Sequence, residues 1–353
     1  MVLPITGPRD FRRKAMKMKG PERPKVVVIG GGTGLSVLLR GLKHRPWQLT
    51  AVVTVADDGG SSGRLRNDLN IPPPGDIRNV LVALSDTEPL LEQVLQYRFR
   101  RGEGLSGHSL GNLLLAALCD VTGDFVTAIK ELSRVLAVRG KVLPSSDQAV
   151  VLKAVMTDGT EVVGESNIPL AGKRIRQLSL LPDDVAANRE AVDEILAADC
   201  LIVGPGSLYT SLLPNLLVKG VAEAVIQSSA CKIYVCNLMT QPGETDGFNA
   251  AEHVDVLVQH VGHRLFDYVI VNRAEFPAAV LQQYAAQGAQ PVAAAEPALS
   301  AMGYQVIADE LISYETYVRH DAQRLGDVIE HVLRHWMHPR QDRDAAPGRR
   351  REG

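Results

Sequence analysis

A series of short, mostly apolar runs is the feature that most constrains the fold of this chain. Each run ends in glycine or polar residues and is followed by a stretch with helical periodicity. The runs are Val26–Ile29, Thr50–Val55, Leu201–Val203, Ile233–Cys236 and Tyr268–Val271. Strands of this kind are buried on both faces, which is typical of a parallel sheet covered by helices. We therefore predict a Rossmann-like, doubly wound α/β fold with a mostly parallel sheet.

One block departs from this alternation of strand and helix. The runs Ala149–Met156 and Glu161–Val163 flank the sequence Thr-Asp-Gly-Thr at 157–160, which favours a tight hairpin turn. Together with Arg174–Leu181, they predict a small antiparallel β insert at about 140–182. The insert is expected to belong to one folded domain rather than to form a second one.

Charge is distributed unevenly along the 353 residues. A single domain is predicted over 24–338, with a flexible basic arm at 1–23 and a disordered, Arg-rich tail at 339–353. The net charge of the whole chain is −2, yet residues 1–25 carry about +6 and residues 334–353 about +3. The body between them is therefore acidic, which argues against a specific nucleic-acid binder.

The cysteines and the apolar runs indicate a cellular compartment. Cys119, Cys200, Cys231 and Cys236 lie in or beside apolar segments without CxxC spacing. This pattern predicts buried, reduced thiols and a reducing cytosol. We find no secretory signal and no apolar run near the ~20 residues that span a bilayer, so a cytoplasmic protein without a transmembrane segment is expected.

A glycine-rich loop follows the first apolar run and opens a helix. It comprises Gly30, Gly31, Gly32, Thr33 and Gly34. Glycines at such a junction let backbone N–H groups approach a ligand, and the helix N-terminus favours an anion such as phosphate. The loop lacks the lysine of a Walker motif, and Leu35 stands where a dinucleotide fingerprint has its third glycine. Phosphate or nucleotide binding is predicted, with a merely tight turn as the alternative.

A carboxylate pair follows the second apolar run. The segment contains Asp57, Asp58, Ser61, Ser62 and Arg64. Ligands of open α/β sheets bind at the carboxyl ends of the strands, so an acid here could accept a ribose hydroxyl. The pair could instead hold Mg²⁺ beside a phosphate, to which Arg64 would offer its guanidinium. A solvated Gly/Ser turn is the alternative.

A proline-rich loop precedes the next helical stretch. Its sequence at 72–79 is PPPGDIRN. Because the prolines stiffen the loop, Arg78 and Asn79 are held at the start of the helix and are candidate ligand contacts. Asp76 is expected to cap that helix.

Residues 107–112, with the sequence GHSLGN, contain the G-x-S-x-G pattern of hydrolases. A nucleophile elbow needs a buried strand immediately before it, whereas this segment follows a polar, arginine-rich one. We instead expect Ser109 to cap the following helix. His108 and Asn112 then face a ligand, with His108 as the most plausible titrating group.

A second strand–glycine–helix junction contains Gly204, Gly206 and Ser207. Two such junctions on one sheet could hold the two ends of one phosphorylated ligand. Further candidates for the same edge are Asn237, Gln241, Glu244, Thr245 and Arg319. Helical spacing would let His331, His335 and His338 bind zinc, although an amphipathic helix end is the favoured interpretation.

At these motifs the chain resembles the gluconeogenesis factor family (YvcK-like), a branch of the superfamily of 2-phospho-L-lactate transferase (CofD-like). The resemblance covers about Lys25 to Trp336. It rests on the segments VVVIGGGTGLSVLLRGL, VTVADDGGSSGRLR, PPPGDIRNVLVALS, GHSLGNLLLAAL, VLAVRGKVLP, GPGSLYTSLLPNLLV and NLMTQPGETDGF. It implies a Rossmann-like fold and a cytoplasmic regulator that binds UDP-sugars, notably UDP-N-acetylglucosamine.

Members of the family are understood to support cell shape and growth on gluconeogenic carbon sources. The resemblance places the ligand on the two glycine junctions, Asp57–Arg64 and Arg319, and implies no catalytic residue. Protein partners in cell-wall regulation and a homo-oligomer are open expectations. The alternative is an enzyme, a Mg²⁺-dependent transferase of the 2-phospho-L-lactate type. An NAD-dependent dehydrogenase is disfavoured by Leu35.

Overall fold

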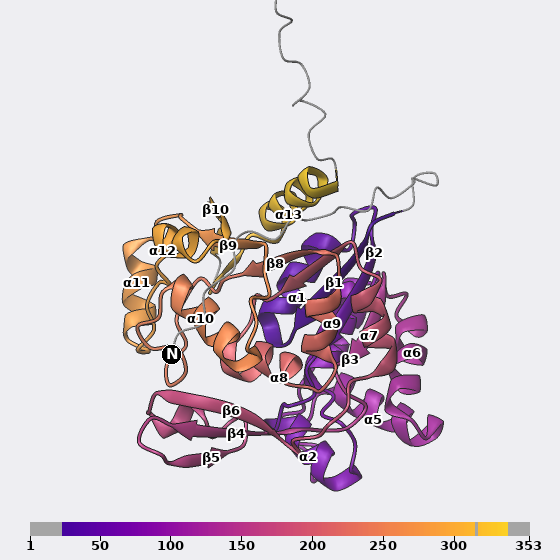
Figure 1. Cartoon of the computed structure of the whole chain (residues 1–353). Helices are drawn as coiled ribbons and strands as arrows, with labels where there is room; N and C mark the ends of the chain where they lie inside the picture. The colour runs from indigo at the N-terminus through magenta and orange to yellow at the C-terminus, as the bar shows by residue number, and fades with distance from the viewer. Residues whose placement is uncertain (1–22, 315–316, 338–353) are drawn as a thin grey trace, which may run out of the picture.

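The computed structural model describes residues 23–314 and 317–337. The predicted basic arm falls almost entirely outside these residues, and the predicted tail falls wholly outside them. The described chain forms a central parallel sheet with helices on both faces, and a small β-sheet arm lies to one side (Figure 1).

The seven-stranded sheet has the order β10-β9-β8-β7-β1-β2-β3. All its neighbouring strands run parallel. They are β1 (Lys25–Gly30), β2 (Gln48–Val53), β3 (Lys141–Pro144), β7 (Cys200–Val203), β8 (Cys231–Val235), β9 (Tyr268–Asn272) and β10 (Gln305–Asp309). The chain moves outward from β1 to β3, returns, and then moves outward from β7 to β10. This reversal between β1 and β7 is a topological switch point, and the doubly wound prediction is confirmed.

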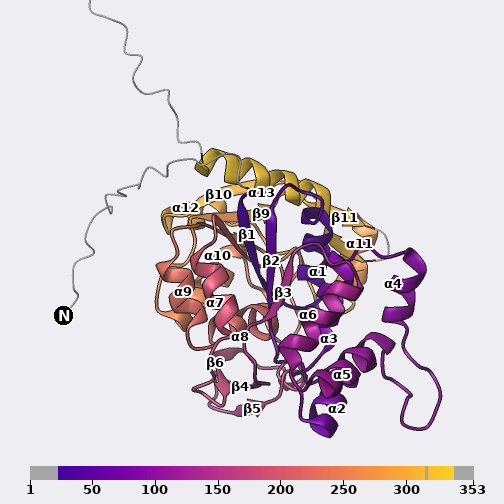
Figure 2. The same cartoon turned by 90° about the vertical axis from the view of Figure 1, so that its right-hand side faces the viewer.

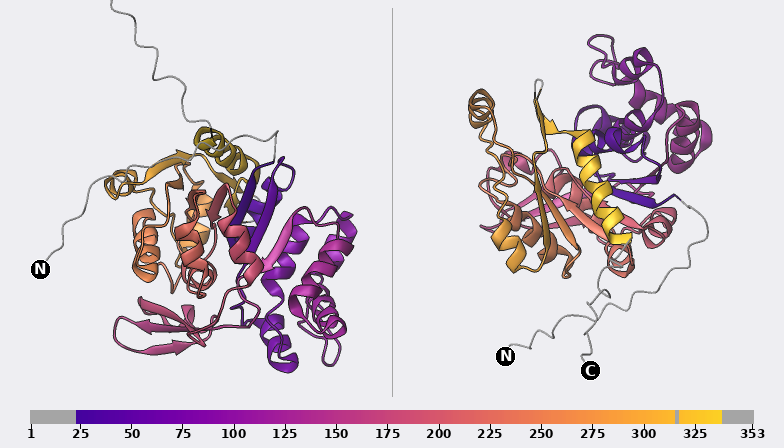
Figure 3. Two further views of the ribbon diagram at one scale, coloured as in Figure 1. Left: turned by 45° about the vertical axis from the view of Figure 1, so that its right-hand side comes forward. Right: turned by 90° about the horizontal axis from the view of Figure 1, so that it is seen from above.

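The apolar strands are explained by two helical layers. On β1, Val26 and Val28 face one core and Val27 and Ile29 face the other. The helices that pack in the first core are α1 (Gly32–Leu42), α3 (Gly75–Leu84), α5 (Leu110–Thr122), α6 (Phe125–Val135) and α13 (Ala322–Met337). The helices that pack in the second core are α7 (Arg189–Leu196), α8 (Leu213–Leu216), α9 (Val221–Gln227), α10 (Ala250–Val261) and α12 (Glu296–Ala301). Figure 3 shows α13 crossing one face of the sheet. Burial on both sides leaves these strands without a polar face.

Smaller elements surround the two layers. Beside α5 lie α2 (Gly60–Leu69) and α4 (Pro89–Gln96), at the edge of the molecule (Figure 2). Past β9 come α11 (Ala278–Ala285) and an antiparallel hairpin of β11 (Ile312–Tyr314) and β12 (Val318–His320). All four cysteines are buried and free. In the described part of the chain, we find no helix with the length and apolarity to cross a bilayer.

The β insert is smaller than the predicted range. It is a three-stranded antiparallel sheet, order β5-β4-β6, made of β4 (Val151–Met156), β5 (Glu161–Val163) and β6 (Ile175–Leu181), with a short 3₁₀ helix η1 (Pro169–Ala171). The predicted hairpin turn at 157–160 joins β4 to β5. Residues Lys141–Pro144, inside the predicted range, instead extend the parallel sheet as β3, because their backbone pairs with β2 from Thr50 to Val53.

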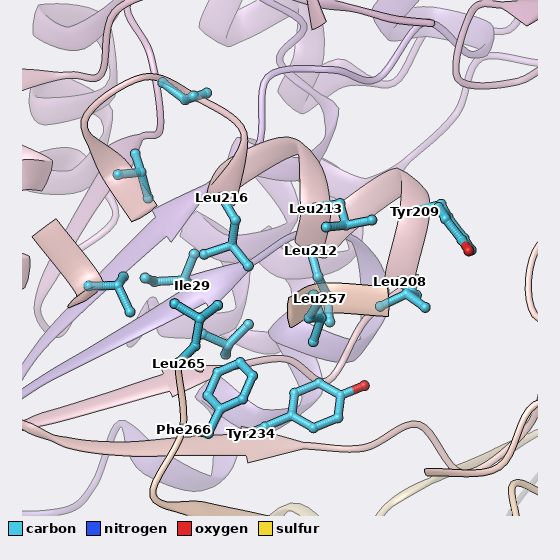
Figure 4. Close-up of a cluster of buried hydrophobic side chains, with 14 of the residues drawn as sticks. Ile29, Leu208, Tyr209, Leu212, Leu213, Leu216, Tyr234, Leu257, Leu265 and Phe266 are labelled. Atoms are coloured by element: carbon cyan, nitrogen blue, oxygen red, sulfur yellow. The ribbon is translucent and has the colours of Figure 1, made fainter. Parts of the chain in front are cut away.

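A dense apolar cluster supports the segment that follows β7 (Figure 4). There the chain forms a π-helical turn, η2 (Leu208–Leu212), and then α8. Leu208, Leu212 and Leu213 are fully buried, and the rings of Tyr234 and Phe266 stack at 5.3 Å below them. Each such leucine contributes about 1.5–3 kcal/mol to stability. The packing therefore fixes the backbone that leads into the second glycine junction.

Candidate functional site

A cavity of about 650 Å³ lies at the switch point, where β1, β7 and β8 end. Both glycine junctions border it. The sequence-predicted residues that line it are Gly31, Gly32, Thr33, Gly34, Gly206, Ser207, Asn237, Gln241, Glu244 and Arg319. Because the sheet order reverses here, the helices that follow β1 and β7 pack on opposite faces of the sheet, and a crevice forms at the ends of these strands. The volume is in the range of small-molecule sites.

The first glycine loop is packed too tightly for side chains at two positions. A Cβ on Gly31 would lie 2.6 Å from Oδ2 of Asp76, and a Cβ on Gly34 would lie 2.7 Å from the Pro205 carbonyl oxygen. Gly32 has a positive φ of 65°. Helix α1 begins here with no side-chain cap and no acidic residue in its first turn. Its positive end therefore borders the cavity, and no side chain of the helix itself neutralises it.

Asp76 does not cap its own helix, which corrects the sequence-based expectation. The N-cap of α3 is Pro74, and the Asp76 carboxylate instead accepts the Gly32 N–H at 2.8 Å. Burial and the negative charge of Asp57 raise the pKa of Asp76 to about 6. The carboxylate in the first turn of α3 thus holds the glycine loop in place, a contact that local sequence patterns do not reveal.

The second junction has most of its polar groups satisfied within the protein. The Gly206 N–H donates to Asn237 Oδ1 at 3.1 Å, and Ser207 caps η2 by accepting the Thr210 N–H at 3.3 Å. The Ser207 hydroxyl donates to Glu244. Burial raises the pKa of Glu244. This junction therefore presents a carboxyl and hydroxyl pair to the cavity, in addition to backbone amides.

The side of the cavity near β12 is built by residues that sequence analysis mostly missed. Tyr284 on α11 accepts the Val318 N–H at 3.0 Å and so ties the β11–β12 hairpin to that helix. Tyr317, Arg319 and His320 follow along the hairpin and also line the cavity. Arg319 is exposed and brings a positively charged guanidinium to the cavity lining. A guanidinium in this position suits an anionic ligand.

A second set of predicted residues forms a buried polar cluster beside the cavity. The Nδ1 of His108 lies 3.0 Å from Ser61 Oγ, and the Asn112 amide donates to Ser61 at 3.1 Å and to Ser62 at 3.4 Å. Ser109 accepts the Asn112 N–H at 3.3 Å, which confirms it as the N-cap of α5. The predicted residues that do not line the cavity are Gly30, Asp57, Asp58, Ser61, Ser62, Arg64, Arg78, Asn79, His108, Ser109, Asn112, Gly204 and Thr245.

Glu165 lines the cavity and lies near the predicted carboxylates Asp57 and Asp58. It belongs to the β insert, in the loop between β5 and η1. Burial, with the nearby charges of Asp57 and Asp58, raises the pKa of Glu165 to about 8. The adjacent Ser166 N–H donates to Asp58 Oδ1 at 2.9 Å. The insert thus places the carboxyl of Glu165, protonated at neutral pH, at the site. No sequence pattern predicted this residue.

The sequence offered two possible metal sites, Mg²⁺ at Asp57 and Asp58 and, less favoured, zinc at His331, His335 and His338. Among the residues that the structure describes, no group of three or more His, Cys, Asp or Glu side chains is arranged to hold a metal ion. Asp57 accepts the Gly59 N–H at 2.9 Å, so one of its oxygens is already engaged. His331 and His335 lie on α13, whereas His338 is outside the described residues. The Mg²⁺ interpretation of Asp57 and Asp58 stays a prediction.

Comparisons with known proteins identify the family of this chain. The family model described as 2-phospho-L-lactate transferase CofD matches residues 26–312. A gluconeogenesis factor of Bacillus subtilis is 53% identical over 314 residues, which are 89% of this chain and 99% of that protein. One from Halalkalibacterium halodurans is 54% identical over 87% of this chain and 96% of its own length. A crystal structure of a UPF0052 family protein from Bacillus halodurans superimposes with a TM-score of 0.86 at 54% identity, covering 88% of this chain and 100% of that one.

A Rossmann-like parallel sheet with a cavity at its switch point defines the general class, a doubly wound α/β protein. The chain belongs to the CofD family and, within it, to the gluconeogenesis factors. Arg319 and His320, which line the cavity, lie beyond residues 26–312, the stretch that the family model matches.

Proposed function

We propose that the chain is a cytoplasmic regulator that binds a nucleotide sugar of the UDP-N-acetylglucosamine type. In this role it supports cell shape and growth on gluconeogenic carbon sources through a protein partner in cell-wall regulation. The single observation that carries the binding proposal is the convergence of both glycine junctions on one cavity of about 650 Å³. The ligand's diphosphate lies at the N-terminus of α1, near Thr33 and Arg319.

The acidic groups around the cavity are compatible with an anionic ligand. Glu165 has a pKa raised to about 8 and is therefore mostly protonated at neutral pH. Burial also raises the pKa of Glu244, which accepts from Ser207. A protonated carboxyl donates a hydrogen bond rather than repelling phosphate, and either carboxyl can bind the hydroxyls of a sugar. The polar lining therefore suits a ligand with both phosphate and hydroxyl groups.

Isothermal titration calorimetry with UDP-N-acetylglucosamine tests the proposal. The wild type should bind, whereas Arg319→Gln should bind at least about tenfold more weakly, because it loses a charge-assisted contact. Arg176→Gln is a matched control, since Arg176 is exposed on β6 and outside the cavity. Absence of heat with a folded wild type, together with no thermal stabilisation by any uridine nucleotide, would exclude this function.

The second candidate is a Mg²⁺-dependent transferase of the 2-phospho-L-lactate type. It is favoured by the family model and by the carboxylates Asp57 and Asp58 beside the cavity. In this case the two carboxylates hold the ion next to a nucleotide diphosphate. Incubation with guanosine-diphospholactate, a deazaflavin acceptor and Mg²⁺ separates the two candidates. Formation of a phospholactyl product supports the enzyme, and nucleotide-sugar binding without turnover supports the regulator.

A further inference from the structure

His320 is a buried histidine in the wall of the candidate cavity. It ends strand β12, lines the cavity and is only 7% exposed. Arg319, its neighbour on the strand, is exposed. Successive side chains of a strand point to opposite sides, so the guanidinium lies on the open side of the cavity and the imidazole ring lies in its buried wall. The two residues can therefore contact different parts of one ligand.

The backbone around His320 is held on both sides. Its pairing partner across the hairpin is Ile312 on β11. Just beyond it, the Asp321 N–H donates to the Leu311 carbonyl oxygen at 2.8 Å, and the Leu311 N–H donates to Asn272 Oδ1 at 3.0 Å. Strand β12 also packs against α1, whose N-terminus borders the cavity. These contacts fix the position of the strand that carries the ring.

The surroundings of the His320 ring determine which of its nitrogens carries a proton. The ring is hydrogen-bonded to the backbone of Cys236, which follows β8. Because the Cys236 N–H already donates to the Ile270 carbonyl oxygen at 3.0 Å, the ring donates to the Cys236 carbonyl oxygen. Among the residues that the structure describes, Nε2 of His320 has no partner, so the donor is Nδ1–H. Burial lowers the pKa of His320 to about 4, so Nε2 keeps a free lone pair at neutral pH.

A buried acceptor without a donor is costly, and His320 Nε2 is such an acceptor in a residue that borders the cavity. A ligand removes this cost only with an O–H or N–H group. The oxygens of an ionised diphosphate carry no hydrogen to donate. The phosphates therefore match Arg319 and the N-terminus of α1, whereas Nε2 matches a hydroxyl or an N–H of the sugar or of the nucleoside.

We propose that His320 Nε2 accepts a hydrogen bond from a hydroxyl or N–H group of the bound nucleotide sugar, and so selects against ligands that offer only phosphate oxygens. The inference rests on the proposed function, because it assumes a ligand that has both phosphates and donor groups. In this role His320 determines specificity, whereas Arg319 supplies positive charge.

Calorimetry of the full chain with UDP-N-acetylglucosamine and with UDP tests the role of His320. His320→Phe keeps a flat ring without an acceptor and should weaken binding of UDP-N-acetylglucosamine by at least about fivefold, because the donor of the ligand loses its partner. His320→Gln keeps an accepting oxygen and should lose less affinity than His320→Phe. An equal loss with UDP assigns the donor to the nucleoside, and a loss confined to UDP-N-acetylglucosamine assigns it to the sugar; both results support the proposal.

His253→Phe is the matched control. Nε2 of His253 is likewise buried and has no partner in the part of the chain that the structure describes. Its ring, however, contacts the ring of Phe248 at 5.7 Å, and His253 does not line the cavity. The same replacement at this position should leave the affinity for both ligands unchanged.

Nitrogen NMR of the histidine rings examines the same atom in the wild type. The His320 signals, identified by their absence in His320→Phe, should show Nδ1 protonated and Nε2 unprotonated at neutral pH. Addition of UDP-N-acetylglucosamine should shift the Nε2 signal as this atom accepts a hydrogen bond. A protonated Nε2 in the free protein, or wild-type affinity of His320→Phe for both ligands, would overturn the proposal. A wild type that binds no uridine nucleotide would instead refute the proposed function, and this inference with it.

Discussion

Replacing Asp76 by asparagine tests how the glycine loop is held. The Asp76 carboxylate accepts the Gly32 N–H at 2.8 Å, and its pKa is raised from 3.8 to about 6 by burial and by Asp57. A difference of about two pKa units corresponds to about 3 kcal/mol, which the folded state loses once Asp76 is ionised. Asparagine keeps the shape and the accepting oxygen but carries no charge.

The sign of the pH dependence follows from the raised pKa. The folded state binds this proton more tightly than the unfolded state does. The stabilisation that it contributes is fully present below 3.8 and is lost as the pH rises through about 6. Asp76→Asn should therefore be more stable than the wild type at neutral pH, and its advantage should grow by about 1–2 kcal/mol between about pH 5 and about pH 8.

Urea unfolding at these two pH values measures the free energies of the wild type, Asp76→Asn and Asp76→Ala. Alanine leaves the Gly32 N–H without its partner and should be about 1–3 kcal/mol less stable than asparagine. Two results would refute the reasoning. One is an asparagine advantage that is equal at both pH values, and the other is an alanine variant as stable as the asparagine variant.

Three further predictions concern the candidate site. Thr33→Ala should weaken UDP-N-acetylglucosamine binding by more than about twofold with little loss of stability. Calorimetry measures the affinity and a melting curve measures the stability; an unchanged affinity would contradict the prediction. Affinity for the same ligand should fall as the pH rises through about 8, where Glu165 ionises, and Glu165→Gln should remove that dependence; a wild-type affinity that is flat across this range would argue against it. Gly34→Val should destabilise the fold by at least about 1–3 kcal/mol, because its Cβ would meet the Pro205 carbonyl oxygen at 2.7 Å, and unchanged urea unfolding would show that the loop can yield.

The sequence predicted the fold class for a local reason. Strands buried on both faces need apolar residues at every position, and Val26–Ile29 or Leu201–Val203 show this without any tertiary information. The glycine junctions were visible because a strand that turns directly into a helix needs residues without a Cβ, as Gly31 and Gly34 now show. The N-cap role of Ser109 was similarly local.

Contacts between distant segments were not predictable in this way. Asp76 was expected to cap the helix that it begins, yet it bonds to Gly32, 44 positions earlier. Residues 141–144 were assigned to the insert, although pairing with β2 makes them an edge strand. Glu165 carried no signal at all, because its raised pKa comes first from burial and then from carboxylates such as Asp57 and Asp58, more than a hundred positions away. Backbone partners and local dielectric are set by folding rather than by neighbours in sequence.

The sequence by itself determined that this chain forms a doubly wound parallel sheet with two glycine junctions, because hydrophobic periodicity and backbone freedom are properties of neighbouring residues. Only the tertiary structure decided that both junctions meet at one switch-point cavity, with Arg319 and Glu165 beside them. It likewise gathered His108 and Asn112 with Ser61 in a buried polar cluster outside the cavity lining. The physical reason is that strand order and loop direction determine which distant side chains share a space.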